Sequence, residues 1–229
     1  MMQNITVRAG QAFAAALLFV LCQAAVPRGA AAQDAAGFIQ NLGNDAIQVL
    51  GPSVPQAQRT AHFRHLFEAD FDLPDAARFV LGPNARLLTP EQNQEFLTVF
   101  REYLAQAYSK RLAEYGGEPF HVTGSRENGE ETVVSSQIQR RNGAPVEIDW
   151  HVINRDGGWQ VTDVYVDGVS MKVTHRHEFA SIIQRNGGRP EALIPALRQQ
   201  LGQAQAQPAR SGSSSEPMAA PSASQHLDR

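Results

Sequence analysis

Histidine pairs are the first candidates for chemistry in this sequence. His62 and His65 lie three residues apart and can share one helix face, but no third ligand is close in sequence. His175 and His177 lie two residues apart, a spacing that points them in different directions on a helix. Because a metal site needs several converging ligands, we expect no bound metal. We interpret the first pair as core-edge or surface residues and the second pair as solvated helix residues.

A pair of aspartates, Asp163 and Asp167, flanks the last expected strand and points to one side of it. A carboxylate buried beside an aromatic cavity can act as a general base, because desolvation raises its pKa toward neutrality. The stronger interpretation is structural, since Asp167-Gly168 is a turn sequence and Asp163 can pair with a basic side chain or cap a backbone group. The sequence has no Gly-rich phosphate loop, nucleophile elbow or paired-cysteine metal motif. We therefore expect neither an enzyme nor a bound cofactor.

Helices that would position these residues follow from the spacing of apolar side chains. Thr89-Pro90-Glu91-Gln92 combines a capping residue, a proline at the first helical position and a capping-box partner, and Gly116-Gly117 ends the long helix that begins there. The helices predicted by the 3.6-residue period cover residues 38–50, 56–71, 74–81, 90–115, 172–184 and 190–201.

The period changes to two between residues 120 and 166. Four strands are expected, at residues 120–126, 131–140, 146–154 and 159–166, and the short turns between them make neighbours antiparallel. One face is apolar in register and is formed by Val134, Ile138, Val146, Ile148, Trp150, Val152, Val164 and Val166. Such a face needs helices over it, which predicts an α+β fold with a four-stranded antiparallel sheet wrapped by helices.

The two ends of the chain differ from the domain between them. The apolar run at residues 12–26 is too short to span a membrane and is followed by Ala30-Ala31-Ala32, a pattern typical of a secretory signal peptide over residues 1–32. An N-terminal membrane anchor is the alternative. The domain then covers residues 33–202, and residues 203–229, rich in Ala, Ser, Pro and Gln, are expected to form a disordered tail.

Composition sets limits on partners and on the forces that hold the fold. The single cysteine, Cys22, lies in the predicted signal peptide, so the exported domain must be held by its core without disulfides. The formal net charge is −3 at pH 7, and no stripe of Lys and Arg stands out. A nucleic-acid partner therefore has no electrostatic support.

A family resemblance enters at residues 159–188, "WQVTDVYVDGVSMKVTHRHEFASIIQRNGG". This stretch resembles the C-terminal signature of the MlaC, or toluene-tolerance, family of periplasmic lipid carriers. In that signature a strand of the form Trp-x-Val-x-Asp-Val-x-Val-(Asp/Glu)-Gly-Val-Ser leads into a helix with an Arg and a Phe, here Arg176 and Phe179. The likeness continues upstream through "FDLPDAARFVLG" and "LTPEQNQEFLTVF" and covers most of the chain before the tail.

Three positions depart from the family pattern. Ala85 stands where an aromatic residue is common, Thr162 stands where Tyr is usual, and Thr174-His175 replaces the usual Asn-Tyr. These departures leave the expected fold unchanged but bear on cargo preference. A hopanoid-linked branch of the family makes a polycyclic lipid an alternative cargo.

The resemblance implies a cone-like arrangement, similar to nuclear transport factor two, in which sheet and helices surround a deep apolar pocket. Such a pocket takes lipid tails and leaves the head group outside. The resemblance also implies a periplasmic, non-catalytic carrier that shuttles phospholipid between an outer-membrane lipoprotein complex and an inner-membrane ABC transporter complex.

On this resemblance we expect the acyl chains to lie between the apolar sheet face and the facing helices. The expected lipid-binding residues are Leu81, Phe96, Phe100, Leu104, Val134, Ile138, Ile148, Trp150, Val152, Val164, Val166 and Val169. Two alternatives stay open. One is an enzyme of the ketosteroid-isomerase type on the same fold, with Asp163 or Asp167 as the base. The other is an interaction module whose apolar stripes are fully packed core.

Export predicts a defined processing site. Mature protein recovered from a periplasmic fraction should begin at or near Gln33, because cleavage would follow the small residues Ala30-Ala31-Ala32. N-terminal sequencing of the purified protein measures this directly. Protein that retains Met1 and stays in the membrane fraction would instead identify residues 1–32 as an anchor.

Overall fold

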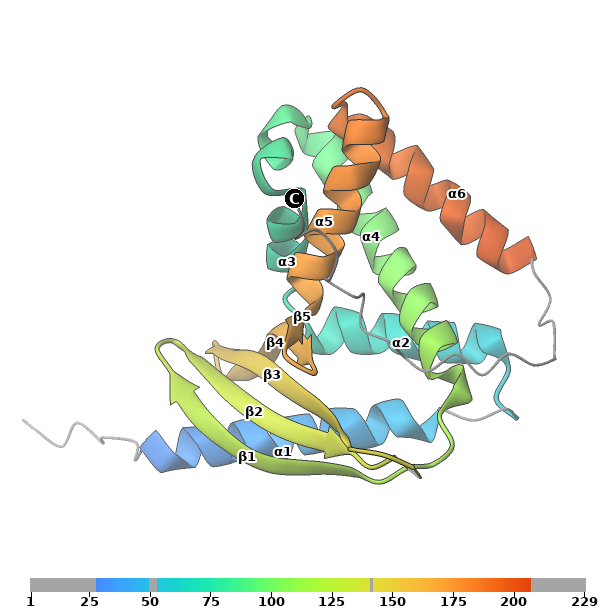
Figure 1. The fold of residues 1–229 in the computed structure, drawn as a ribbon. Coiled ribbons are helices and arrows are strands. Elements are labelled where there is room, and N and C mark those ends of the chain that lie inside the picture. The colour runs from blue at the N-terminus through green and yellow to red at the C-terminus, as the bar shows by residue number, and fades with distance from the viewer. Residues whose placement is uncertain (1–27, 50–52, 141, 207–229) are drawn as a thin grey trace, which may run out of the picture.

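The computed structural model describes residues 28–49, 53–140 and 142–206 and has an α+β fold (Figure 1). The helices are α1 (Arg28–Gln48), α2 (Gln56–Asp70), α3 (Leu73–Leu81), α4 (Pro90–Arg111), α5 (Met171–Arg185) and α6 (Leu193–Ala206), with short 3-10 turns at Gly82–Leu87, Leu112–Glu114 and Pro190–Ala192. The strands are β1 (Phe120–Asn128), β2 (Glu131–Ile138), β3 (Val146–Arg155), β4 (Gly158–Val166) and β5 (Val169–Ser170). They form one antiparallel sheet in the order of the chain.

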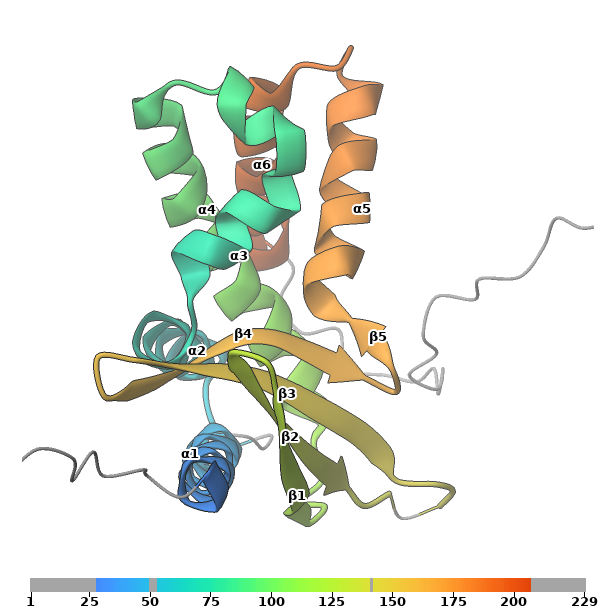
Figure 2. The same ribbon diagram turned by 90° about the vertical axis from the view of Figure 1, so that its left-hand side faces the viewer.

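The helices form two groups around the sheet. Helix α1 lies along β1 and β2, while α3, α4, α5 and α6 stand as an upright group above β4 and β5 (Figures 1 and 2). Helix α2 runs across the base of this group and packs mainly on α4. Helix α1 thus covers one end of the sheet, and α2, α3 and α5 meet its other end at β4.

Local signals in the sequence account for the boundaries of these elements. The capping box at the start of α4 is confirmed: Thr89 Oγ1 accepts from the backbone N–H of Gln92 (3.2 Å), and Gln92 Oε1 accepts from the backbone N–H of Thr89 (2.9 Å). The turn from β4 into β5 uses Asp167 and Gly168 at φ of 48° and 81°. Positive φ at both central residues is typical of a tight hairpin, and Gly168 adopts it without steric cost.

That hairpin corrects the expected strand count. Four strands were predicted, but Val169 and Ser170 pair with Val166 and Tyr165 and add a fifth, two-residue strand before α5. A strand this short has no period that the sequence could reveal. At the ends of the domain, the helix expected at residues 38–50 starts earlier, at Arg28, and α6 runs on to Ala206, past the expected tail boundary at residue 203.

The predicted signal peptide and tail lie mostly outside the described residues. Of residues 1–32, only Arg28–Ala32 are described, as the first turns of α1, and of residues 203–229 only the end of α6. The export and tail predictions therefore stay predictions.

Strand register confirms the apolar face. Trp150 in the middle of β3 pairs with Val134 on β2 and with Val164 on β4, and Ile148 pairs with Val166. Cross-strand partners share a face, so these side chains form one apolar surface. The pairing then skips Thr162 on β4, because His151 pairs with Asp163 and the next residue of β3 pairs with Val161. This β-bulge restarts the alternation one residue out of phase.

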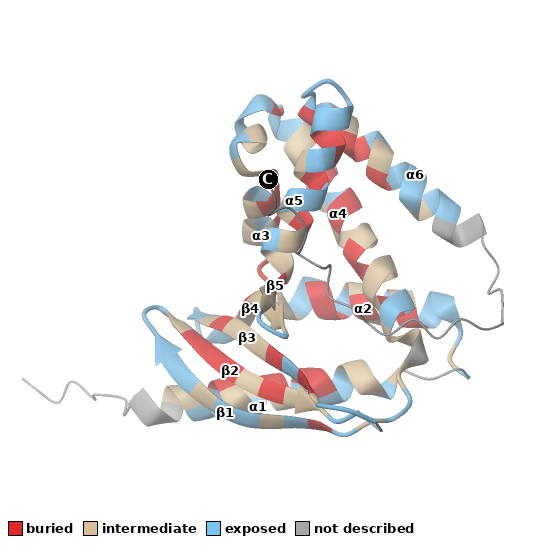
Figure 3. Ribbon diagram, in the orientation of Figure 1, coloured by how far each residue is buried: buried red, intermediate tan, exposed pale blue. Residues whose placement is uncertain are grey.

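The core is most tightly filled among the upright helices. Phe96 and Phe100 of α4 stack at 5.5 Å between ring centroids, and Phe179 of α5 meets both rings edge-on. Leu193 and Leu197 of α6 are fully buried in the same cluster. Figure 3 shows buried residues along α4 and β2, whereas most of β1 is exposed.

The contact between α1 and the sheet predicts an unequal effect of two glycine substitutions. A Cβ on Gly43 would lie 2.3 Å from the ring of buried Phe120, whereas a Cβ on Gly37 of the same helix would meet nothing within 4 Å. We expect Gly43→Ala to destabilise the protein by about 1–3 kcal/mol through overpacking. Gly37→Ala, the control, should leave stability unchanged or raise it by up to about 1 kcal/mol. Urea unfolding followed by circular dichroism measures both, and equal effects would show that α1 does not dock on β1 as described.

Candidate functional site

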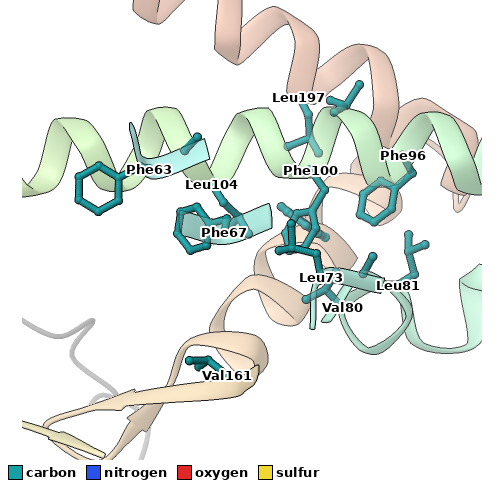
Figure 4. Close-up of a cluster of buried hydrophobic side chains, with 14 of the residues drawn as sticks. Phe63, Phe67, Leu73, Val80, Leu81, Phe96, Phe100, Leu104, Val161 and Leu197 are labelled. Atoms are coloured by element: carbon teal, nitrogen blue, oxygen red, sulfur yellow. The ribbon is translucent and has the colours of Figure 1, made fainter. Parts of the chain in front are cut away.

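An apolar cavity lies between β4 and helices α2, α3, α4 and α5. Its volume is about 180 Å³, and it is open to solvent. Its lining is almost entirely apolar. Figure 4 shows Phe63 and Phe67 of α2 and Leu104 of α4 toward one end of the buried cluster, with Val161 of β4 below it.

Helix stripes form the larger part of the wall. The lining residues from α1 to α4 and the segments next to these helices are Leu42, Ala46, Phe63, Leu66, Phe67, Phe71, Asp72, Leu73, Ala76, Val80, Phe100, Leu104, Tyr108 and Leu112. Phe100, Leu104 and Tyr108 of α4 recur every four residues, and Leu112 in the turn after α4 continues the spacing, so one side of the helix faces the cavity. The phenylalanines of α2 approach this side, with Phe67 and Tyr108 at 5.7 Å between ring centroids.

The sheet and the start of α5 close the other side. Their lining residues are Trp150, Val161, Thr162, Asp163, Val164, Val166, Met171, Lys172 and His175. Strict alternation would turn Val161 and Val164 to opposite faces, because they are three residues apart. The bulge at Thr162 shifts the alternation of side chains by one residue, so both valines lie on the face toward the cavity.

Of the twelve residues predicted to bind lipid, the structure brings five to the cavity wall. These are Phe100, Leu104, Trp150, Val164 and Val166. Their contact with a ligand stays a prediction.

The other seven predicted residues lie away from the cavity. Leu81 and Phe96 belong to the filled core of the upright helices, at the far end of the cluster in Figure 4. Val134 and Ile138 lie on β2, the strand beside α1, and Ile148 and Val152 pack at positions of β3 outside the lining. Val169 is in the short strand β5. A residue on the apolar sheet face therefore does not have to line the cavity, because the cavity borders only the part of that face around Trp150, Val161, Val164 and Val166.

Several cavity residues were missed by the sequence analysis. The stripe of Phe63, Leu66 and Phe67 was recognised as a helix face, but nothing in a single sequence says which helix borders a cavity. Val161 was missed because the bulge has no sequence signal. His175 was interpreted as a solvated helix residue, and this is wrong: it is buried, with 8% of its surface exposed, and lines the cavity.

Asp163 is engaged as a helix cap. Its carboxylate accepts hydrogen bonds from Ser170 Oγ (2.5 Å), from the backbone N–H of Lys172 (3.1 Å) and from its own neighbour Val164 N–H (2.8 Å). Ser170 in turn caps α5 by accepting from Val173 N–H (3.1 Å). These contacts fix the start of α5 against β4, which agrees with the structural interpretation of Asp163.

Asp167 lies outside the cavity lining, on the exposed turn between β4 and β5. Its carboxylate accepts from the backbone N–H of Glu147 (3.0 Å) and lies 4.0 Å from Arg140. The two aspartates proposed as alternative bases therefore do not share one site.

Two ion pairs hold α3 as a wall of the cavity. Arg155 at the end of β3 donates to Asp72 (2.5 Å), and Lys172 of α5 donates to Asp75 (3.2 Å). Burial alone would raise the pKa of Asp75, but the hydrogen bond and charge of Lys172, together with Arg78, lower it. Asp75 is therefore held ionised, and its pair ties α3 to α5.

A polar chain runs through the wall between α4 and α5. Tyr108 Oη lies 3.4 Å from His175 Nε2, His175 Nδ1 lies 3.3 Å from Glu178 Oε2, and Tyr103 Oη donates to both oxygens of Glu178 at 3.2 Å. Hydrogen bonding by His175 lowers the pKa of Glu178, while burial raises the pKa of Tyr108 to about 12. Glu178 is thus an anion and Tyr108 a neutral phenol at neutral pH.

The departures from the family pattern fall unevenly on the structure. Thr162 and His175 both line the cavity, whereas Ala85 packs against the core from the turn after α3.

Among residues 28–49, 53–140 and 142–206, no three His, Cys, Asp or Glu side chains converge as a metal site. No helix in this part of the chain has the length and apolar character to cross a membrane.

Comparisons with known proteins agree on one family. The sequence model of the family described as MlaC protein matches residues 40–199. The toluene tolerance protein ttg2D of Pseudomonas putida is 32% identical over 111 residues, which cover 48% of this chain and 52% of that protein. The intermembrane phospholipid transport system binding protein MlaC of Haemophilus influenzae is 26% identical over 137 residues, covering 58% of this chain and 63% of that protein. The match thus spans between half and two thirds of these relatives.

A solved structure shares the fold. The phospholipid-binding protein of Ralstonia solanacearum, determined in complex with a phospholipid, superposes with a TM-score of 0.63 at 22% identity. The match covers 75% of this chain and 98% of that protein.

The role of Asp163 as a cap predicts a stability effect that Asp167 should not share. Asp163→Asn replaces one accepting oxygen by a donor beside the start of α5, and we expect a loss of about 1–2 kcal/mol of unfolding free energy. Asp167→Asn should change it by less than about 0.5 kcal/mol, since Asn tolerates positive φ and still accepts from Glu147. Urea unfolding measures both. An Asp163→Asn protein as stable as the wild type would remove the capping role.

Proposed function

The chain belongs to the MlaC family, and we propose that it is a lipid carrier that shelters phospholipid acyl chains in the apolar cavity. The observation that carries this proposal is the cavity itself, with walls of Phe, Leu and Val on four helices and one strand. The Haemophilus relative is named as the binding protein of a phospholipid transport system, and the Ralstonia structure contains a phospholipid. Both support lipid as the ligand of the same fold.

The energetics of transfer explain why such a protein needs a cavity and no catalyst. Each methylene kept from water contributes about 0.8 kcal/mol, so a tail of about sixteen carbons represents on the order of 12 kcal/mol during transfer. Apolar walls that exclude water, such as those formed by Phe63, Phe67 and Leu104, supply this free energy by shielding the tail. Polar groups in the lining would lower the affinity unless the ligand satisfied them.

Catalysis is not part of the proposal. A general base must reach a substrate proton, but the carboxylate of Asp163 already accepts three hydrogen bonds and Asp167 lies on the far side of the turn. We therefore propose a non-enzymatic carrier rather than an isomerase on the same fold. Lipid recovered from the purified protein supports the carrier, and turnover of isomerase or hydrolase substrates abolished by Asp163→Asn would overturn it.

Location and partners follow from the family resemblance and the N-terminal sequence. We propose that residues 1–32 direct export to the periplasm and are removed. There the domain would receive and deliver phospholipid between an outer-membrane lipoprotein complex and an inner-membrane ABC transporter complex. The identity of the cargo, including a hopanoid-like lipid as an alternative, is open to lipid extraction and mass spectrometry of the purified protein.

Two valine substitutions test whether the cavity binds the tails. Val164 lines the cavity, so a tryptophan ring at this position should occupy tail space while the protein stays folded. Val152 is fully buried outside the lining, so Val152→Trp should overpack the core and cost about 1–3 kcal/mol or more. Melting temperature and co-purified lipid, measured by native mass spectrometry on the same preparation, separate these effects.

The expected pattern is loss of lipid with a retained melting temperature for Val164→Trp, and a lowered melting temperature for Val152→Trp. Wild-type lipid content in folded Val164→Trp protein would mean that tails do not occupy this cavity. Wild-type protein that carries no lipid and binds none when offered phospholipid vesicles would overturn the carrier function as a whole.

A further inference from the structure

Most polar side chains in the cavity wall are satisfied by good hydrogen bonds within the protein. Asp72 accepts from Arg155 at 2.5 Å, Thr162 donates to Glu131 at 2.8 Å, and Asp163 accepts from Ser170 at 2.5 Å. Lys172 donates to Asp75 at 3.2 Å, and the Trp150 indole N–H donates to Ser136 at 2.8 Å. None of these groups needs a ligand to complete its bonding.

Tyr108 and His175 differ from these groups. Both line the cavity, and each is the other's neighbour, but Tyr108 Oη and His175 Nε2 are 3.4 Å apart. Good N···O hydrogen bonds measure about 2.7–3.2 Å, so this contact is weak. A buried imidazole and a half-buried phenol therefore lie in an apolar cavity wall, joined to each other by one long contact.

The surrounding groups define what each atom can do. The Glu178 carboxylate can only accept, so in the neutral form of the imidazole the proton lies on Nδ1, which faces Glu178 Oε2 at 3.3 Å. Nε2 is then an acceptor. Tyr108 keeps its phenolic proton, because burial raises its pKa to about 12, and is a donor. The wall thus presents one donor and one acceptor side by side.

The imidazole is held in place by rings on both helices. It stacks on Phe179 at 5.9 Å and 29° and meets Phe100 and Tyr103 edge-on at 6.5 Å and 5.8 Å between centroids. A polar pair fixed by this packing is preorganised for a ligand and does not have to be ordered on binding.

We propose that Tyr108 Oη and His175 Nε2 form a subsite for a hydroxyl group carried on the apolar part of the bound lipid. A hydroxyl accepts from Tyr108 and donates to His175, and so satisfies both atoms. An ester carbonyl can only accept and leaves Nε2 without a donor, and a methylene group leaves both atoms unsatisfied. The subsite rests on the proposed carrier function and narrows its cargo to lipids with a hydroxylated tail or ring.

Displacement of a fluorescent fatty acid from the mature, delipidated protein tests the subsite. The competitors are stearic acid and a series of octadecanoic acids that carry one hydroxyl at different positions along the chain. In slightly alkaline buffer, where imidazoles are neutral, at least one hydroxylated isomer should bind roughly five-fold more tightly than stearic acid. The series is needed because the depth of the subsite along a bound tail sets which position fits.

Variants separate the subsite from general binding. Tyr108→Phe removes one oxygen atom, and His175→Phe keeps a ring in the same packing. Both should bind stearic acid at least as well as the wild type and lose the preference for the hydroxylated isomer. His177→Phe on the exposed side of the same helix is the matched control and should keep the preference. Circular dichroism establishes that each variant is folded. If His175→Phe does not fold, the result for Tyr108→Phe decides whether the subsite exists.

Two outcomes overturn the subsite while leaving the carrier function intact. One is equal affinity of the wild type for stearic acid and every hydroxylated isomer. The other is a preference that survives in both variants. If the wild type binds none of these acids, the carrier function itself fails, and the subsite fails with it.

Discussion

An extra residue in β4, Thr162, decides which side chains of that strand face the helices. If β4 kept strict alternation through this residue, Val161 and Val164 would lie on opposite faces, and the sheet would contribute one valine fewer to the cavity. Next to the bulge, the carbonyl of Val161 accepts from the backbone N–H of Asp72 (3.0 Å), which joins the start of α3 to the sheet. Thr162 itself is satisfied by Glu131 and the carbonyl of His151. One inserted residue thus sets both the lining of the cavity and the position of its wall.

Holding an apolar cavity open is costly, since voids in cores destabilise by about 24 cal/mol per Å³. The walls must therefore be fixed by contacts that do not fill the space. In this protein they are polar and lie at the edges: Arg155 with Asp72, Lys172 with Asp75, and Asp163 with the start of α5. The tightly filled core of Phe96, Phe179 and the α6 leucines lies on the other side of the wall and supports it. The cavity is therefore kept open by two kinds of contact: the apolar core supports its wall from one side, and the ion pairs and hydrogen bonds fix its edges.

The features that can be predicted from the sequence are those that depend on residues close together in the chain. The capping box at Thr89 and the turn at Asp167-Gly168 depend on neighbours in the chain, and both were predicted correctly. The apolar sheet face was also correct in register, because a period of two is local.

The features that the sequence analysis missed or assigned wrongly depend on how helices and strands pack against one another. Leu81 and Phe96 are large apolar residues next to or one turn from Val80 and Phe100, yet only the second pair lines the cavity. The difference lies in where α3 and α4 diverge from the sheet, which no period records. The bulge at Thr162 and the burial of His175 have the same origin, since each depends on a partner far away in sequence.

The distribution of polar groups in the cavity wall bears on the choice between container and catalyst. A general base must reach a substrate proton, whereas the Asp163 carboxylate already accepts hydrogen bonds from Ser170, Lys172 and Val164. Asp163 thus joins β4 to α5, and Asp167 holds the turn after β4 against β3. Tyr108 and His175 are the pair in the described part of the wall whose mutual bond is long, and they face each other across the gap between α4 and α5. The other polar groups of the wall have good hydrogen-bond partners, so this long contact is the place where a ligand could add hydrogen bonds. Such a place lets a binding protein distinguish one apolar cargo from another.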